Sequence, residues 1–206
     1  RNQLVRFIEE TFSNDMTSQS GINVSVSAVT LDLDDGSIKQ PYNGSDEGSV
    51  FPNDGKQALT SWNPHLIYVE GGNTFWLHYC LNKGSEDWFR LICEACCCTD
   101  SDERRPALYV GKSAGAIVAG KYVETATWKG WDDPSIVPGL ETYDDWMGSR
   151  GLDLVGGVSV FPHMSEDWVE LVNDKKGSLD GDEMITLQEQ EACCIEGSLH
   201  DSFISS

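Results

Sequence analysis

Residues 107–120 read ALYVGKSAGAIVAG, an apolar strand that runs through a glycine turn into a helix of small residues. The turn itself, residues 111–115, has the pattern G-x-S-x-G. Small residues beside a serine permit a sharp strand-to-helix turn, in which a strained backbone lifts the hydroxyl above the sheet. The amide of Ala114 would then point, with the helix N-terminus, to where negative charge develops. The pattern also occurs in ordinary strand-helix turns, but its flanking strand and helix favour a nucleophile elbow with Ser113 as the nucleophile.

A similar unit lies earlier in the chain. Residues 65–69 read HLIYV and lead directly into the glycine turn GGNT at 71–74, after which residues 75–83 and 86–98 have helical patterns. Strand, glycine turn and helix in repetition predict a parallel α/β sheet, whose sites gather at the C-terminal ends of the strands. No repeat, linker or low-complexity tract divides the chain, so we expect a single domain over residues 1–206.

The remaining segments complete this expectation. We expect helices at 2–13, 56–62 and 168–172, strands at 24–33, 152–161, 184–187 and 192–195, and a long surface excursion at 34–55.

Charge and cysteine content narrow the class of protein. The net charge is −20, and no basic stripe is present that could bind phosphates, so nucleic acid is not an expected partner. No apolar run of about 18 residues could cross a membrane, and no signal pattern opens the chain. The seven cysteines are odd in number and bunched, which favours reduced thiols on a buried helix face over disulfides or zinc. We expect a soluble, cytoplasmic protein without a metal or organic cofactor.

A serine nucleophile needs a base, and histidine is the side chain suited to that role. The chain has four histidines, at 65, 78, 163 and 200. His163 follows an apolar strand and Pro162, at a strand end where the site should lie, so it is the preferred base. The first two histidines suit structural roles better, at a strand start and on a helix.

The base in turn needs a carboxylate to orient it. Glu189 ends a short strand downstream of His163 and is one candidate, but Asp182, Glu183 and Glu191 remain rivals on sequence grounds.

Residues 125–151 form an irregular stretch rich in aromatic and acidic residues, with tryptophans at 128, 131 and 146. The tryptophans can cover the core under a long loop, or some of them can line a substrate cleft.

Four motifs together resemble the peptidase E and cyanophycinase family of the class I glutamine amidotransferase-like superfamily. They are VEGGNTF at 69–75, YVGKSAGAIVAG at 109–120, FPH at 161–163 and LQEQEACCIEG at 187–197. The resemblance implies a flavodoxin-like three-layer α/β/α sandwich with a mainly parallel central sheet. It also implies a Ser-His-Glu triad in that chain order, with Glu189 as the acid, and an oxyanion hole formed by the amides of Gly72 and Ala114.

Two features depart from this family. Its members usually have one or two strands before the helix that the N-terminal residues resemble, so we expect either that this sequence lacks those strands or that its sheet is shorter. Its aspartyl dipeptidases carry a basic residue soon after the histidine, whereas residues 164–168 read MSEDW here. We therefore expect a small peptide substrate with a cationic group, bound near Glu166 or Asp167. Asn73 is expected as a further substrate contact. A homodimer is considered as one assembly state.

Two other functions remain open at this level. An α/β-hydrolase esterase orders its triad as serine, acid and histidine, which Asp182 and His200 could supply. A non-catalytic binding protein could retain the same fold. A glutamine amidotransferase would need a cysteine where Ser113 stands.

Overall fold

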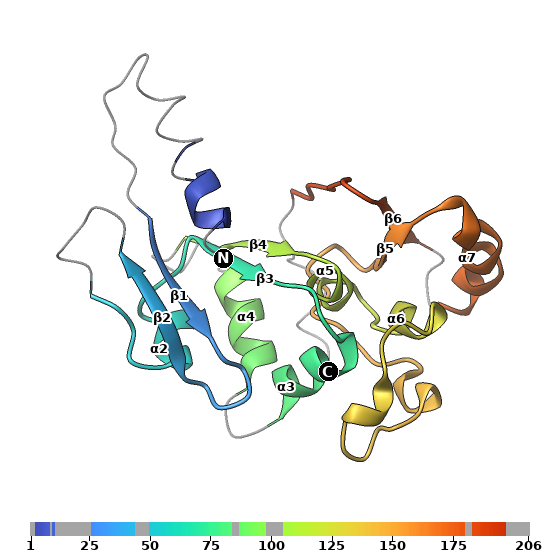
Figure 1. The fold of residues 1–206 in the computed structure, drawn as a ribbon, viewed down its shortest axis with the longest axis horizontal. Coiled ribbons are helices and arrows are strands. Elements are labelled where there is room, and N and C mark those ends of the chain that lie inside the picture. Colours follow the sequence, from blue (N-terminus) through green and yellow to red (C-terminus); the bar gives the residue numbers. More distant parts are fainter. Residues whose placement is uncertain are drawn as a thin grey trace. The chain divides into compact units, whose positions relative to one another are not determined.

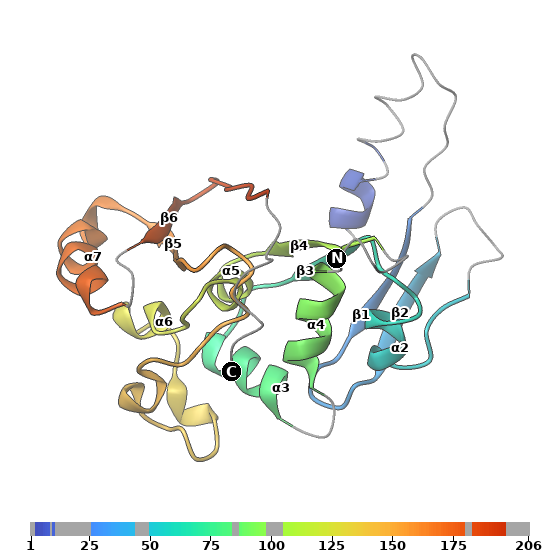
Figure 2. The same ribbon diagram turned by 180° about the vertical axis from the view of Figure 1, so that it is seen from behind.

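A computed structural model describes residues 3–8, 10, 26–43, 50–83, 87–97, 105–179 and 183–196 (Figures 1 and 2). The chain divides into two compact units, residues 1–62 and residues 63–206. The expectation of a single domain stays a prediction. No helix within the described ranges is long and apolar enough to cross a membrane.

The first unit contains a helical stretch at 3–8 and 10, an antiparallel hairpin and a short helix. Its elements are β1 (Ser27–Leu31), β2 (Ile38–Asn43) and α2 (Gly55–Leu59). The hairpin corrects the expected surface excursion, because β2 pairs with β1 across a turn. In that turn the Asp32 carbonyl accepts a hydrogen bond from the Gly36 amide at 2.8 Å, and Gly36 has a φ of +72°. Turn residues dominate the local composition and hide the strand that follows them.

The second unit is built around two parallel strand pairs, which establish an α/β fold. The first pair is β3 (Leu66–Val69) with β4 (Leu108–Gly111), and the second is β5 (Ser159–Met164) with β6 (Met184–Gln188). Within the described part of the chain each pair forms a separate two-stranded sheet. The flavodoxin-like three-layer sandwich therefore stays a prediction.

Within the described residues of this unit, five α-helices and four short 3-10 helices connect the strands. The α-helices are α3 (Thr74–Asn82), α4 (Trp88–Cys96), α5 (Ala114–Ala119), α6 (Thr125–Trp128) and α7 (Val169–Lys175). The 3-10 helices are η1 (Pro134–Ile136), η2 (Tyr143–Trp146), η3 (Glu166–Trp168) and η4 (Lys176–Ser178).

Helix α5 joins the two parallel pairs. It packs against β3 and β4 on one side and against β5 on the other (Figure 1), and all six of its residues are buried. Its small side chains allow this close approach, because a larger residue would push the strands apart.

Two expected strands are corrected. Of the expected strand at 152–161, only the part from Ser159 is extended in a sheet, since Gly156 and Gly157 have φ values of +76° and +85° and form a turn. The Asp153 carboxylate accepts a hydrogen bond from the Gly157 amide in this turn. Residues 192–195 are exposed and have no strand partner among the described residues.

Buried aromatic side chains anchor the segments that carry the candidate site residues. Phe161 packs with Trp128, Val172 and Leu179, and it lies two residues before His163. Phe75 is fully buried against Trp146, with ring centroids 4.8 Å apart, directly after the GGNT turn. The strand end that carries His163 and the GGNT turn are therefore each adjacent to a buried, packed aromatic residue.

Candidate active site

The two glycine turns meet at one edge of the β3–β4 pair. The strands are in parallel register with Val69 opposite Gly111, so both turns leave the sheet at the same level. A Cβ atom on Gly71 would lie 3.1 Å from the Cβ of Ser113 and 3.6 Å from its hydroxyl oxygen. The GGNT turn thus lies directly against the serine.

Ser113 is held in a strained conformation by its neighbours. Its φ is +51° and its ψ is −111°, a combination rarely adopted by residues with a side chain. A Cβ atom on Gly111 would lie 2.4 Å from the Gly115 carbonyl oxygen, and one on Gly115 would lie 2.2 Å from the Val69 carbonyl oxygen. Both glycines are needed because backbone passes where a side chain would be.

Two backbone amides beside the serine are available to a ligand. Among the described residues, no group accepts a hydrogen bond from the amides of Gly72 or Ala114. Ala114 is the first residue of α5, and Gly72 follows Gly71, which touches Ser113. This is the local arrangement from which an oxyanion hole can be built.

His163 reaches Ser113 from the second strand pair. Its Nε2 lies 3.0 Å from the Ser113 Oγ. The residue has a φ of +55°, and the β5–β6 register shifts between Phe161 and Met164, so the strand bulges where His163 stands. Bulges beside a site commonly redirect one side chain, and here the redirected imidazole meets the serine.

Glu189 completes the row on the other side of the imidazole. Met164 is paired with Gln188 at the end of β6, which puts Glu189 next to His163. A Glu189 carboxylate oxygen is hydrogen bonded to the His163 Nδ1. The carboxylate side chain is 75% exposed and the imidazole side chain 30% exposed. Of the rival acids, Glu191 instead accepts a hydrogen bond from the Gln188 amide, and Asp182 lies outside the described residues.

The expected substrate contacts are only partly near the triad. Asn73 caps α3 by accepting a hydrogen bond from the Trp76 amide, and its Nδ2 donates to the Asp133 carbonyl at 2.9 Å. Glu166 and Asp167 are exposed in η3, and neither lines the cavity at Ser113. All three remain predicted substrate contacts, although Asn73 already has a structural role.

A loop that follows α6 docks onto the GGNT turn. The Asp132 carboxylate accepts a hydrogen bond from the Thr74 amide at 2.9 Å, at the N-terminus of α3 where a negative charge is favoured. The Tyr143 hydroxyl donates to the Asp132 carbonyl. These contacts hold the loop against the site.

This loop brings to the site Lys129, which the sequence did not indicate as a site residue, and Trp131, one of the tryptophans that could line a cleft. Both line the same cavity of about 40 Å³ as Ser113 and His163. Trp131 is 61% exposed and its ring centroid lies 5.8 Å from that of His163, whereas Trp128 and Trp146 are buried. The tryptophans therefore divide between the two roles considered from the sequence. A lysine between two tryptophans in W-K-G-W was the available signal for Lys129.

Charges around the site are shaped by burial and pairing. Burial lowers the pKa of Lys129 to about 8, against a smaller opposing effect of Glu189. On the outer side of the turn, Lys112 lies 3.0 Å from Glu70 and its hydrogen bond lowers the pKa of that carboxyl. No cluster of metal-binding side chains is found among the described residues.

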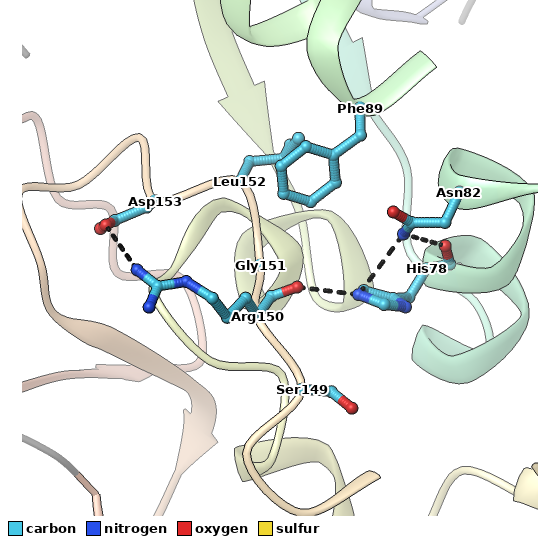
Figure 3. Close-up of a pocket in the computed structure, with 8 residues that line it drawn as sticks. All are labelled: His78, Asn82, Phe89, Ser149, Arg150, Gly151, Leu152 and Asp153. Atoms are coloured by element: carbon cyan, nitrogen blue, oxygen red, sulfur yellow. Dashed lines mark hydrogen bonds and ion pairs between the residues drawn. The ribbon is translucent and has the colours of Figure 1, made fainter. Parts of the chain in front are cut away.

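A larger cavity of about 380 Å³ lies elsewhere in the second unit (Figure 3). It is formed by His78 and Asn82 of α3, Phe89 of α4 and the segment 149–153. The His78 Nε2 lies 2.8 Å from the Arg150 carbonyl, and the Arg150 guanidinium faces Asp153. None of Ser113, His163 and Glu189 lines it.

Comparison with protein families identifies one that matches most of the chain. The family model described as peptidase family S51 matches residues 52–202. No curated protein matches the chain. Among solved structures, the crystal structure of a candidate peptidase E protein from Listeria monocytogenes is 26% identical, with 57% of this chain and 50% of that chain covered and a TM-score of 0.38. The chain thus spans about half the length of that protein.

Proposed function

This chain belongs to peptidase family S51, and on that premise we propose that it is a serine-type peptidase, resembling peptidase E, that hydrolyses small peptides. The observation that carries the proposal is the row of hydrogen bonds from Ser113 through His163 to Glu189. The order of the three residues along the chain is the order that the family resemblance implies. We also propose that the chain has a flavodoxin-like sandwich fold and acts in the cytoplasm. Assembly into a homodimer is left as an open alternative.

Acylation follows from the positions of the first two groups. The His163 Nε2 accepts the proton of the Ser113 hydroxyl while the serine oxygen attacks the peptide carbonyl carbon. The C–N bond then breaks, and the imidazolium donates its proton to the leaving amine. The acyl group remains as an ester on Ser113.

Deacylation repeats the same proton transfers with water. His163 removes a proton from a water molecule, the hydroxide attacks the ester carbonyl, and the proton returns to the Ser113 oxygen as the carboxylic acid leaves. Glu189 holds the Nδ1–H tautomer of the imidazole and stabilises the imidazolium in both steps.

The developing oxyanion needs preorganised donors. The amides of Gly72 and Ala114 are proposed for this role because both lie beside Ser113 and neither has an acceptor among the described residues. Because the hole is made of backbone, its integrity depends on the turns rather than on any side chain.

We propose that the substrate carries a cationic group, such as a basic side chain or a free amino terminus. Exposed carboxylates follow the histidine at Glu166 and Asp167, and Asp133 lies on the docked loop. Lys129 is the cation nearest to the serine among the cavity-lining residues, and its Nζ donates to two backbone carbonyls. On this proposal, these carboxylates repel an acidic substrate side chain and attract a cationic one.

A peptide panel tests the function and its specificity together. Wild-type protein is incubated with Lys-X, Arg-X and Asp-X dipeptides and with their amino-blocked forms, and released products are measured. The proposal predicts hydrolysis that Ser113→Ala abolishes, with the basic dipeptides preferred. Preference for Asp-X would contradict the specificity, and hydrolysis that survives in Ser113→Ala would contradict the mechanism.

The esterase alternative makes a different prediction. Its histidine, His200, lies outside the described residues, whereas His163 contacts Ser113. Separate His163→Ala and His200→Ala variants distinguish the two, because the peptidase proposal requires loss of hydrolysis with the first and retention with the second. Binding of peptides without any hydrolysis would favour the non-catalytic alternative.

A further inference from the structure

Lys129 contacts the strand that carries the imidazole, not only the cavity. Its Nζ donates hydrogen bonds to the carbonyl oxygens of Pro162 and His163, at 2.5 Å and 2.8 Å. These two residues fall within the bulge of β5, between the pairs that Phe161 and Met164 make with β6. A bulge disrupts the ladder locally, so the ammonium group supplies hydrogen bonds to carbonyls at the break.

Aromatic rings surround the same ammonium group. The Nζ lies 4.4 Å from the ring centroid of Trp131, 4.2 Å from that of Phe161 and 5.4 Å from that of Trp168. Cations are attracted to the faces of aromatic rings. The lysine is therefore held from several sides, and its position is well determined.

The backbone that Lys129 contacts is strained where the imidazole needs it to be. His163 has a φ of +55°, which is unfavourable for a residue with a side chain and persists only when surrounding contacts impose it. We propose that Lys129 is a positioning residue: its ammonium group holds His163 in this conformation and so keeps the imidazole against Ser113. The inference rests on the proposed peptidase function and adds a supporting cation to it.

A different role for Lys129 would have different kinetics. A lysine that bound a substrate carboxylate would change KM when removed, whereas a positioning residue changes kcat. The two hydrogen bonds to backbone carbonyls favour positioning, because they direct donors of the ammonium group to the protein itself.

The kinetic experiment compares Lys129→Met, Lys129→Arg and the control Lys121→Met. The control also removes an ammonium group near an aromatic ring, that of Tyr122, but Lys121 does not line the cavity. Circular dichroism verifies that each variant is folded. A fluorophosphonate, which reacts covalently with activated serines, measures the reactivity of Ser113 independently of peptide binding. We expect Lys129→Met to lower both kcat and the rate of this phosphonate labelling by about 100-fold, since small misplacements of catalytic groups have effects of this size. KM should change little. Lys129→Arg should recover most of the loss, and Lys121→Met should match the wild type.

A spectroscopic readout needs no substrate. The proton between the His163 Nδ1 and Glu189 should give a low-field NMR signal, identified by its absence in His163→Ala. The signal should be retained in Lys129→Arg and broadened or lost in Lys129→Met. If wild-type protein neither hydrolyses peptides nor reacts with the phosphonate, the proposed function fails, while this signal still tests the positioning.

Wild-type protein provides the test if Lys129→Met does not fold. Raising the pH until Lys129 loses its proton should weaken the same signal, with Glu189, His163 and Asp132 as the other titratable groups of the site. Unchanged kcat, labelling rate and low-field signal in Lys129→Met would overturn the proposal. In the wild type, a low-field signal that does not change as Lys129 loses its proton would also overturn the proposal.

Discussion

The His163 Nε2 and the Ser113 Oγ lie 3.0 Å apart, although 50 residues separate them in the chain and they leave different strand pairs. Helix α5, which begins directly after Ser113, packs on β5, which carries His163. The contact between serine and imidazole is therefore set by the packing of one short buried helix.

Strain at Ser113 should appear as a stability difference between two inactive variants. Ser113→Ala keeps the unfavourable φ of +51°, whereas Ser113→Gly removes the clash that makes it unfavourable. The glycine relieves about 1–3 kcal/mol of strain, and its larger entropy loss on folding offsets part of this gain. We therefore expect the free energy of unfolding of Ser113→Gly to exceed that of Ser113→Ala by about 1 kcal/mol. Urea unfolding measures this difference, and equal stabilities would contradict the strain.

Glu189 and its neighbour Glu191 should differ sharply in function. Glu189→Gln removes the charge that stabilises the imidazolium, so we expect kcat to fall by about 10²–10⁴-fold. Glu191→Gln is the matched control, because the Glu191 carboxylate accepts a hydrogen bond from the Gln188 amide and, among the described contacts, none from His163, so its replacement should leave kcat near the wild-type value. A larger fall in kcat for Glu191→Gln than for Glu189→Gln would contradict the assignment of Glu189 as the acid of the triad.

Gly115 should tolerate no side chain, whereas Gly139 should tolerate one at a modest cost. A Cβ atom on Gly115 meets the Val69 carbonyl oxygen at 2.2 Å, but one on Gly139 has no atom within 4 Å and only its φ of +82° is unfavourable. We expect Gly115→Ala to lower the free energy of unfolding by about 3 kcal/mol or more. Gly139→Ala should lower it by about 1 kcal/mol. Thermal unfolding compares them, and similar losses would show that the turn at Ser113 is looser than described.

The rate of hydrolysis should decline above about pH 8, the pKa to which burial lowers Lys129. Below that pH the ammonium group holds His163, and above it the positive charge is lost. Lys129→Arg should move the decline to higher pH, because a guanidinium keeps its proton there. The pH profile of kcat/KM measures both, and a decline at the same pH in Lys129→Arg would assign it to another group.

Loss of stability through the titration of Lys129 does not explain such a decline. The folded pKa of Lys129 is below its ordinary value of 10.5, so between about pH 8 and pH 10.5 the unfolded chain binds more protons than the folded one. From this group alone, the free energy of unfolding therefore rises with pH across that window.

Asn73 tests whether a predicted substrate contact is structural. Asn73→Asp keeps the oxygen that caps α3 but loses the Nδ2 that donates to the Asp133 carbonyl. We expect a small loss of stability, and a larger one of about 1 kcal/mol for Asn73→Ala, which also loses the cap. A rise in KM with unchanged stability in Asn73→Asp would restore the substrate role.

Local patterns predicted those parts of the fold that depend on few residues. The G-x-S-x-G motif correctly predicted a turn between an apolar strand and a small-residue helix at Ser113, because backbone clearance at Gly111 and Gly115 leaves few alternatives. The apolar runs of β3, β4 and β6 were likewise evident. The hairpin strand β2 was missed because turn-forming residues dominate the composition around it and hide its pairing with β1.

Long-range packing accounts for the site features that the sequence did not reveal. Lys129 contacts the carbonyls of Pro162 and His163, more than 30 residues away in the chain, where Phe161 packs against Trp128. The positive φ of His163 depends on the same packing and on the bulge in β5. The W-K-G-W motif marks Lys129 as a lysine among aromatic residues, but it does not indicate these distant backbone partners.

Mapping a covalent adduct tests the central claim most directly. Wild-type protein and His163→Ala are treated with a fluorophosphonate, digested and examined by tandem mass spectrometry. We predict a single phosphonylated residue, Ser113, in the wild type, and labelling slowed by about 10³-fold or more in His163→Ala. An adduct on another serine, or equal labelling of Ser113 without the imidazole, would contradict the account.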